Sequence, residues 1–321
     1  MAASNRSARP DPGPLHEVIV VGAGPAGLTA ALYLARFRRS VLVLHDGQSR
    51  ALRIPETHNA PAFPDGISGR ELIDRMSVHA ASYGAIVAEA EVTAARRSAS
   101  GFMVSTADGH VWRTRALILA TGVQTNEVDL PRDMHDSAVQ AGVLRYCPIC
   151  DGFEHIGERI GVIGCDTNGA TEALFLRQYS RNITLMPLCH PELSPAQSAE
   201  LHQTGITVVQ GALRSLEPKQ NRMDVFLEGH SDALPFDVVY PALGCRPRSE
   251  LAAALGVQIE KDAPMPADAM KGTEVAGLFA AGDVVEGLDQ ISVAMGHGAM
   301  AATKAHNWLR ERDQHTLQAD E

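Results

Sequence analysis

Two stretches of the chain repeat the same order of hydrophobic and polar positions. In each, a short β-branched apolar run ends in a glycine-containing turn, and a helical pattern of apolar positions follows. A further apolar strand comes after each helix, so each stretch predicts the start of a βαβ unit. The predicted elements are strand 17–21, turn 22–27, helix 28–37 and strand 40–44 in the first stretch, and strand 159–163, turn 164–169, helix 170–179 and strand 182–186 in the second.

The rest of the pattern predicts that the second unit is inserted in the first. A strand over 116–120 ends in Thr121-Gly122, and a strand over 238–243 ends in the same way at Gly244. We therefore expect an α/β fold of two Rossmann-like nucleotide-binding domains with three-layer ββα and βαβ order. The predicted boundaries are a disordered lead-in over 1–14, a first domain over 15–122 and 246–321, and an inserted second domain over 123–245.

Length and charge narrow the class of protein. The 321 residues suffice for two cores, and a formal net charge of −10 argues against nucleic acid or an anionic membrane as partner. Five cysteines, an odd number, do not resemble a secreted disulfide framework. The uncharged run over 18–35 is long enough for a membrane span, but glycines and a proline interrupt its middle. We expect a cytoplasmic protein without a membrane segment.

The first turn carries the G-x-G-x-x-G spacing of dinucleotide-binding loops, and it lies between a strand and a helix. The first glycine allows the turn, the second lets backbone approach a pyrophosphate, and the third lets helix and strand pack closely. An acid that binds a ribose hydroxyl is expected at the end of the next strand. Asp46 fits that place, and the alternative is an ordinary turn acid in Asp46-Gly47. The long irregular stretch up to residue 69, which contains Asn59, is expected to wrap a ligand.

Cys147-Pro148-Ile149-Cys150 is the chain's other chemical signal. Two cysteines at this spacing close a small disulfide ring or together bind a metal. No second pair follows at zinc-ligand spacing, which favours redox chemistry, and we expect no metal. Asp151 follows directly, where a proton must move as thiols form and break. A helix that starts at Cys150 would favour the reactive thiolate. The alternative is a surface CxxC without a role.

In this order, the two loops, the CxxC, and a final strand ending in Gly282-Asp283 before Gln290 resemble the low-molecular-weight thioredoxin reductases. The resemblance covers almost the whole chain after residue 15. It implies a homodimeric flavoprotein with FAD on the first domain. By the same resemblance Cys150 faces the flavin, Cys147 attacks the partner disulfide, and Asp151 donates the proton. The implied FAD-binding residues are Gly22, Gly24, Pro25, Ala26, Gly27, Asp46, Gly47, Gln48, Asn59, Thr121, Gly122, Gly282, Asp283, Gln290 and Ile291.

The second loop departs from the family pattern. Asp166 replaces the middle glycine, and a carboxylate there would face a doubly charged pyrophosphate. Like charges about 4 Å apart repel by about 1 kcal/mol in water and about 4 kcal/mol at an effective dielectric constant of 20. Residues 187–192 contain no Arg or Lys for a 2′-phosphate, and Glu192 comes late for a ribose contact. The sequence therefore predicts that NADPH and NADH reduce the flavin slowly or not at all.

These observations predict an FAD-dependent thiol-disulfide oxidoreductase that acts on a thioredoxin-like protein or a small dithiol. Two alternatives stay open: a dithiol oxidase that uses oxygen, and a non-enzymatic flavin-binding sensor. A plant-type ferredoxin, at about −400 mV, is a sufficient electron donor, since thioredoxin lies near −270 mV. His297 is expected either to shuttle protons at the flavin or to pack. Trp308 is expected to pack against a dimer partner, with stacking on an aromatic ring as the alternative. Met295 and Met300 are expected to pack in the core, and Cys165, Cys189 and Cys245 to be buried.

Overall fold

The computed structural model describes residues 14–164, 166–188 and 193–316. The chain forms two compact units. Unit 1 contains residues up to 54, residues 68–124 and residues from 246 on; unit 2 contains residues 55–67 and 125–245. The short strands β7 (Val123–Thr125) and β15 (Cys245–Pro247), which pair with each other, carry the chain from one unit to the other and back. Residues 55–67 were expected in the first domain, but their contacts group them with unit 2.

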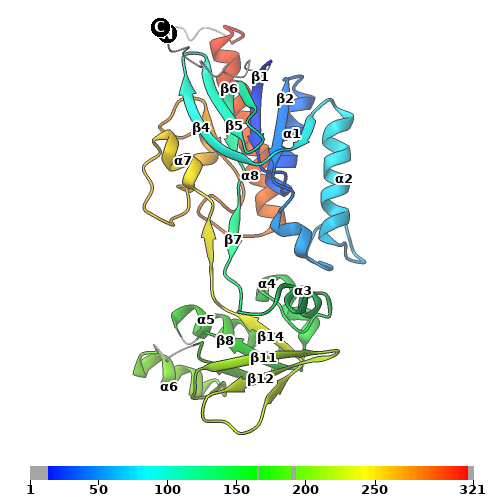
Figure 1. Cartoon of the computed structure of the whole chain (residues 1–321), viewed down its shortest axis with the longest axis vertical. Helices are drawn as coiled ribbons and strands as arrows, with labels where there is room; N and C mark the ends of the chain where they lie inside the picture. Colours follow the sequence, from blue (N-terminus) through cyan, green and yellow to red (C-terminus); the bar gives the residue numbers. More distant parts are fainter. Residues whose placement is uncertain (1–13, 165, 189–192, 317–321) are drawn as a thin grey trace, which may run out of the picture. The chain divides into compact units, whose positions relative to one another are not determined.

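Unit 1 is built on a seven-stranded sheet with the order β3-β2-β1-β6-β5-β4, to which β16 adds beside β6 (Figure 1). Neighbours in the row β3-β2-β1-β6-β16 are parallel, and β4 and β5 continue the sheet as an antiparallel meander. The β-branched run predicted in β1 is buried because it pairs on both sides, with Val20 between Val43 and Ile118. The strands are β1 (Leu15–Val21), β2 (Val41–His45), β3 (Ile86–Glu89), β4 (Val92–Ser98), β5 (Gly101–Thr106), β6 (Val111–Leu119) and β16 (Leu278–Ala280).

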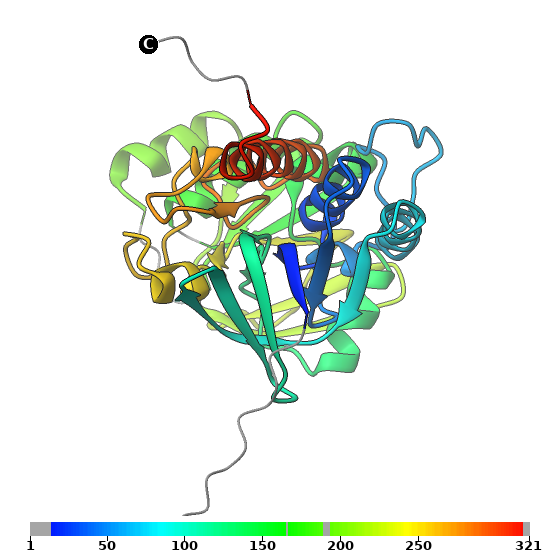
Figure 2. The same cartoon turned by 90° about the horizontal axis from the view of Figure 1, so that it is seen from above.

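Helices α2, α1 and α8 lie in that order along one face of this sheet (Figure 2). Pro25 is at the first position of α1, which suits its fixed φ. Close packing of α1 on α8 depends on Gly298, because a Cβ atom there would overlap the carbonyl oxygen of Ala26. The helices of unit 1 are α1 (Pro25–Arg36), α2 (Gly69–Ser82), α7 (Glu250–Leu255), α8 (Ile291–Arg312) and the 3-10 turns η1 (Arg50–Arg53) and η3 (Ala269–Lys271).

Unit 2 repeats the parallel βαβ plan on a smaller scale. Its parallel sheet has the order β10-β9-β8-β14, and a separate antiparallel sheet has the order β11-β12-β13. The prediction of two Rossmann-like α/β units is therefore confirmed. The helices and strands of unit 2 are α3 (Arg132–Gln140), α4 (Pro148–Asp151), η2 (Gly152–His155), β8 (Arg159–Ile163), α5 (Thr167–Leu176), β9 (Asn182–Met186), α6 (Pro195–Gln203), β10 (Thr207–Val208), β11 (Leu213–Lys219), β12 (Arg222–Leu227), β13 (Leu234–Phe236) and β14 (Val238–Pro241).

Candidate active site

The glycines of the first loop lie where side chains would not fit. Gly22 has φ +108°, and a Cβ atom there would overlap the carbonyl oxygen of Ala120 at the end of β6. A Cβ atom at Gly27 would overlap the carbonyl oxygen of Gly22, so the third glycine lets α1 pack against the turn. Gly24 is the N-cap of α1, and among the described residues no side chain caps this helix end. The uncapped N–H groups suit a bound pyrophosphate.

Arg248, which the sequence reasoning missed, connects three of the predicted cofactor residues. Its guanidinium donates to Asp46 Oδ2 at 3.1 Å, and its backbone N–H donates to the Gly122 carbonyl at 2.9 Å. The Thr121 hydroxyl donates to the Arg248 carbonyl at 2.6 Å. Asp46 Oδ1 accepts the backbone N–H of Gln48 at 2.9 Å, which is the contact expected of a turn acid. The residue pattern gives no signal for Arg248, because it returns to this place from 202 residues further along the chain.

Asp283 follows β16, and its largely buried carboxylate forms an ion pair with Arg50. Arg50 Nη2 lies 3.2 Å from Asp283 Oδ2, and Arg50 Nη1 lies 3.3 Å from Asp289 Oδ2. Burial raises the pKa of Asp283 to about 6, although the Arg50 charge opposes the shift. A buried carboxylate so placed is suited to accept hydrogen bonds from a polyol chain. Arg50, in the long irregular stretch, was not singled out from the sequence.

The other predicted cofactor residues fall into two groups. Gly282 lies against the first loop, since a Cβ atom there would come 2.7 Å from the Ala26 Cβ. Gln290 is the N-cap of α8, and Ile291 is its first residue. Asn59 belongs to unit 2, where its amide donates to the Ile149 carbonyl at 3.4 Å. The structure thus groups Asn59 with the CxxC turn rather than with the glycine loops of unit 1.

Cys147 and Cys150 are joined by a disulfide, with the two sulfurs 2.07 Å apart. The N–H of Cys150 donates to the Cys147 carbonyl at 2.9 Å, which closes the turn. The helix at the CxxC does not start at Cys150. Short helix α4 begins at Pro148, whose fixed φ suits the first helical position, and Cys147 is its N-cap. It is therefore the Cys147 sulfur that stands at the helix N-terminus, where a thiolate is favoured.

Asp151, at the end of α4, lies among three polar groups of unit 2. Its Oδ1 accepts a hydrogen bond from the Tyr240 hydroxyl at 2.7 Å, and its Oδ2 lies 3.4 Å from Arg145 Nε. His155 also acts on it electrostatically. Burial raises the pKa of Asp151, and the Tyr240 hydrogen bond, Arg145 and His155 oppose that shift. An acid of this kind can hold and release a proton nearer to neutral pH than an ordinary aspartate.

The second loop has the spacing of the first but a different helix end. Asp166 is the N-cap of α5, and its Oδ1 accepts the backbone N–H of Gly169 at 2.9 Å. Half-buried Glu172 lies further along the same helix, where burial and the charge of Asp166 raise its pKa to about 7. Two carboxyl groups therefore lie at the loop that binds a dinucleotide phosphate in related folds. Cys165, Cys189 and Glu192, which the sequence reasoning considered, lie outside the described residues.

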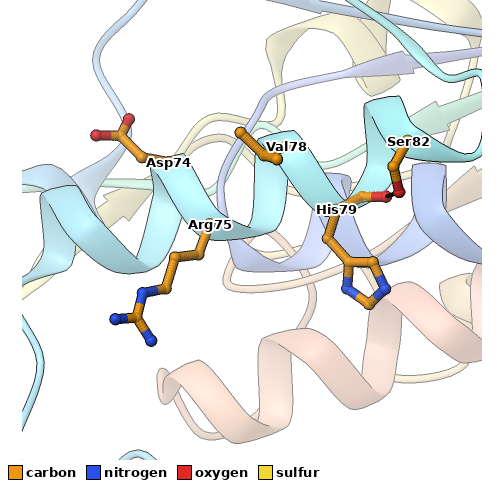
Figure 3. A pocket seen from close by; sticks show the side chains of 5 residues that line it. All are labelled: Asp74, Arg75, Val78, His79 and Ser82. Atoms are coloured by element: carbon orange, nitrogen blue, oxygen red, sulfur yellow. Dashed lines mark hydrogen bonds between the residues drawn. The ribbon is translucent and has the colours of Figure 1, made fainter.

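Other candidates lie apart from this chemistry. A shallow pocket on one face of α2 contains none of the predicted site residues; Figure 3 shows its lining of Asp74, Arg75, Val78, His79 and Ser82. In the described ranges, no group of three or more His, Cys, Asp or Glu side chains could hold a metal ion. No helix in the part of the chain that the structure covers is long and apolar enough to cross a membrane. Cys245 is exposed and not buried as expected, because it lies in the connecting strand β15.

His297 and Trp308 both lie on α8. His297 Nδ1 is buried and makes no hydrogen bond with any described group. Trp308 packs against the core of unit 1, and the guanidinium carbon of Arg312 lies 3.5 Å from its ring centroid. Trp308 thus has a packing role within its own unit. The buried nitrogen of His297 leaves a proton-transfer role open to test.

Comparison with known proteins agrees with this geometry. The family model for pyridine nucleotide-disulphide oxidoreductases matches residues 16–298. The chain is 30% identical to the thioredoxin reductase of Streptomyces coelicolor, covering 92% of this chain and 94% of the relative, and 29% identical to a 34.2 kDa protein in the rubredoxin operon of Clostridium pasteurianum, covering 91% and 97%. The crystal structure of HlmI superposes with a TM-score of 0.84 at 28% identity and covers 94% of each chain. The chain belongs to the pyridine nucleotide-disulphide oxidoreductase family, as a thioredoxin reductase-like, FAD-dependent disulfide oxidoreductase.

Proposed function

We propose that this enzyme exchanges two electrons between FAD and the Cys147–Cys150 pair, and between that pair and a thioredoxin-like protein or a small dithiol. The observation that carries the proposal is the disulfide held in one turn with a largely buried acid at its end. The glycine loop of unit 1, its uncapped helix end and the buried Asp283 support FAD binding in that unit. FAD supplies or accepts the electrons as a pair, which matches one disulfide.

In the proposed reaction, the cysteine pair breaks and re-forms one S–S bond, and Asp151 transfers one proton. When two electrons enter the Cys147–Cys150 disulfide, the S–S bond breaks and one proton is needed to give one thiol and one thiolate. We propose that Asp151 supplies that proton. The Cys147 thiolate attacks a substrate disulfide, forms a mixed disulfide and releases a substrate thiolate. Cys150 returns its proton to Asp151 and, as a thiolate, attacks the Cys147 sulfur of the mixed disulfide. This releases the second substrate sulfur as a thiolate and restores the internal disulfide; the two substrate thiolates take protons from solvent.

We further propose that nicotinamide nucleotides are poor electron donors for this enzyme. Asp166 occupies the N-terminus of α5 with its own carboxylate, whereas the corresponding end of α1 is left uncapped by any described side chain. Glu172 adds a second acidic group near the same loop. Both features oppose a pyrophosphate at the second loop.

The redox role is tested by replacing Cys150 with Ser in the holoprotein. FAD should stay bound with its visible spectrum intact, because Cys150 belongs to unit 2 and the FAD-binding loops to unit 1. Reoxidation of the reduced flavin by a disulfide should fall by at least a hundredfold. Cys245→Ser is the matched control, since this exposed cysteine lies outside the CxxC and should leave the rate unchanged. Normal disulfide turnover by Cys150→Ser would rule out the proposed pair.

The donor proposal is tested by anaerobic stopped-flow of the holoprotein with NADPH and with NADH. Neither nucleotide at sub-millimolar concentration should bleach the visible flavin band within seconds. Complete bleaching on that timescale would make this an ordinary nucleotide-dependent reductase.

A second candidate function is favoured by the same capped helix. An enzyme without a nucleotide donor can run in the other direction, in which a substrate dithiol reduces the flavin and oxygen reoxidises it. The balance is one dithiol plus one O₂ to one disulfide plus one H₂O₂. Peroxide release with a small dithiol, measured beside reduction of thioredoxin by the photoreduced enzyme, separates the two directions. Peroxide formed in proportion to dithiol, with no thioredoxin reduction, would favour the oxidase.

A further inference from the structure

A polar atom stands out in strand β14 of unit 2. All four residues of this strand are buried, and Tyr240, paired with Val162 of β8, is 0% exposed. Its ring belongs to an otherwise apolar core cluster, which a phenylalanine ring would fill equally well. A buried hydroxyl destabilises a core unless it forms a hydrogen bond. The Tyr240 hydroxyl therefore needs a hydrogen-bond acceptor within the fold.

The partner is the carboxylate of Asp151. The Tyr240 hydroxyl donates to Oδ1 at 2.7 Å, and no other described side chain donates a hydrogen bond to Asp151. Arg145 Nε faces Oδ2 at 3.4 Å, but it is buried and makes no hydrogen bond in the described parts of the chain. The His155 ring lies edge-on to the Tyr240 ring, with centroids 6.1 Å apart. One hydroxyl from β14 thus fixes the acid at the end of the CxxC turn.

We propose that Tyr240 is a positioning residue, whose hydroxyl holds the Asp151 carboxyl in place for proton exchange with the active-site thiols. This inference rests on the proposed function, in which Asp151 carries the proton. It assigns a role to a residue 89 positions from its partner, in a strand that otherwise contributes only packing. A purely structural alternative is that the same hydrogen bond anchors α4 to the sheet.

The contact makes a prediction about pH. Burial and the charge of Asp151 raise the pKa of Tyr240 well above its usual value, so its hydroxyl stays protonated and donates. A donor to a carboxylate stabilises the charged form and lowers the pKa of Asp151 from the value that burial alone would give. Of the other charges that act on Asp151, Arg145 and His155 also lower its pKa, and Glu154 raises it. Loss of the hydroxyl should therefore raise the pKa of Asp151.

The test uses Tyr240→Phe in the FAD-loaded protein. The flavin is photoreduced without oxygen and mixed with an aromatic disulfide, and its reoxidation rate is recorded from pH 5 to pH 9. The rate should fall as pH rises through the pKa of Asp151, because the proton donor is lost. In Tyr240→Phe this fall should move upward by about one to two pH units, the size expected for a hydrogen bond to a charged group. The low-pH rate should also drop several-fold as the carboxyl loses its fixed orientation.

Tyr179→Phe is the matched control. The Tyr179 ring also packs at the active-site turn, against Gly152, but its hydroxyl makes no hydrogen bond with any described residue. This variant should keep the wild-type pH profile. A shift of the same size in both variants would mean a general packing effect and would overturn the inference.

Asp151→Asn separates this inference from the proposed function. Loss of the pH-dependent fall in Asp151→Asn assigns the fall to Asp151; its survival would refute the proton-donor role itself. If Asp151→Asn removes the fall and Tyr240→Phe leaves it at the wild-type pH, the role of Asp151 stands and that of Tyr240 fails. The double variant Tyr240→Phe/Asp151→Asn should be no slower than Asp151→Asn. An additional loss in the double variant would indicate the structural anchor and overturn the positioning role.

Discussion

Asp166 and Gly24 occupy the same place in two strand-turn-helix units, yet they give those units different chemistry. Both are N-caps, at the starts of α5 and α1. The Asp166 carboxylate binds the backbone N–H of Gly169, whereas glycine offers no side chain to its helix. One residue therefore decides whether a helix end is open to an external anion.

Replacing Asp166 with Gly should raise the rate of flavin reduction by sub-millimolar NADPH at least about fivefold. The change removes a negative charge and uncaps α5, and like-charge repulsion of about 1 to 4 kcal/mol corresponds to about five- to a thousandfold in affinity. The free energy of unfolding should drop by only a few tenths of a kcal/mol, since glycine is itself a tolerated N-cap. Anaerobic stopped-flow at the flavin band measures the rate.

Ser68→Gly is the control for this prediction, because Ser68 caps α2 of unit 1 by accepting the N–H of Glu71. It should lose a similar stability without any change in nucleotide use. An unchanged NADPH rate in Asp166→Gly would show that the cap is not what limits this donor.

At the residue scale, the sequence could predict which residues lie at the candidate site, but not which side chains they contact. The spacing of the second loop predicts Asp166 at the start of a helix, because strand, turn and helix repeat there, and Asp166 is the N-cap of α5. The contact between Tyr240 and Asp151 crosses 89 residues, and no local pattern records such a pairing. The same holds for Arg248 and Asp46. Burial of single residues was also missed: exposure of Cys245, and of Met295 and Met300 at 38% and 42%, depends on which side of an element meets the core.

Helices α1 and α8 form the closest helix pair of unit 1, and two glycines two residues apart in α8 have opposite roles there. A Cβ atom at Gly298 would overlap backbone atoms of Ala26, so the helices touch at this point. A Cβ atom at Gly296 would have no described atom within 4 Å. Gly296 can therefore take a side chain without a clash, whereas Gly298 cannot.

Gly298→Ala should lower the free energy of unfolding of unit 1 by at least about 2 kcal/mol, because backbone cannot yield to the added methyl group as a side chain can. It should also weaken FAD binding, since Ala26 belongs to the first glycine loop. Gly296→Ala, the matched control in the same helix, should stabilise by about 0.5 to 1 kcal/mol. Thermal unfolding and flavin release on dilution measure both effects. Equal stabilities of the two variants would contradict the packing of α1 on α8.

Elements themselves were the most predictable part of the fold. Strand and helix periodicity located β1, α1, β2, β8, α5 and β9 because each buries one clear set of apolar positions. Limits of elements were less accurate: the sequence predicts a strand over 116–120, whereas β6 runs unbroken through Val111–Leu119. Arg113 and Arg115 interrupt the apolar pattern there, but the ladder to β1 continues past them. Backbone pairing with a neighbour, which a single segment does not reveal, extends the strand.

The whole molecule consists of two units with separate hydrophobic cores. One core cluster lies in unit 1, and two others lie in unit 2. The proposed FAD-binding loops belong to unit 1, and the CxxC belongs to unit 2. Because a ligand stabilises only the folded unit that binds it, FAD should act on the two cores unequally.

Calorimetry of the flavin-free protein should therefore show two unfolding transitions, and added FAD should raise the midpoint of one. With FAD at about a thousand times its dissociation constant, unit 1 should gain about 4 kcal/mol. The transition of unit 2, identified by its response to reduction of the Cys147–Cys150 disulfide, should stay within about a degree. A single transition that moves as a whole with FAD would show that the two cores unfold together.

The cap on α5 fixes the local concentration of an anion at the second loop. The Asp166 carboxylate is tethered one residue before the helix it caps, so its effective concentration at that helix end is at least on the order of millimolar, however dilute the protein is. Under the proposed function, a nucleotide at sub-millimolar concentration would compete with a resident anion that dialysis, purification and dilution leave in place. In this respect the Asp166 carboxylate would act as a covalently attached competitive inhibitor of the loop, and only a mutation can lower its local concentration.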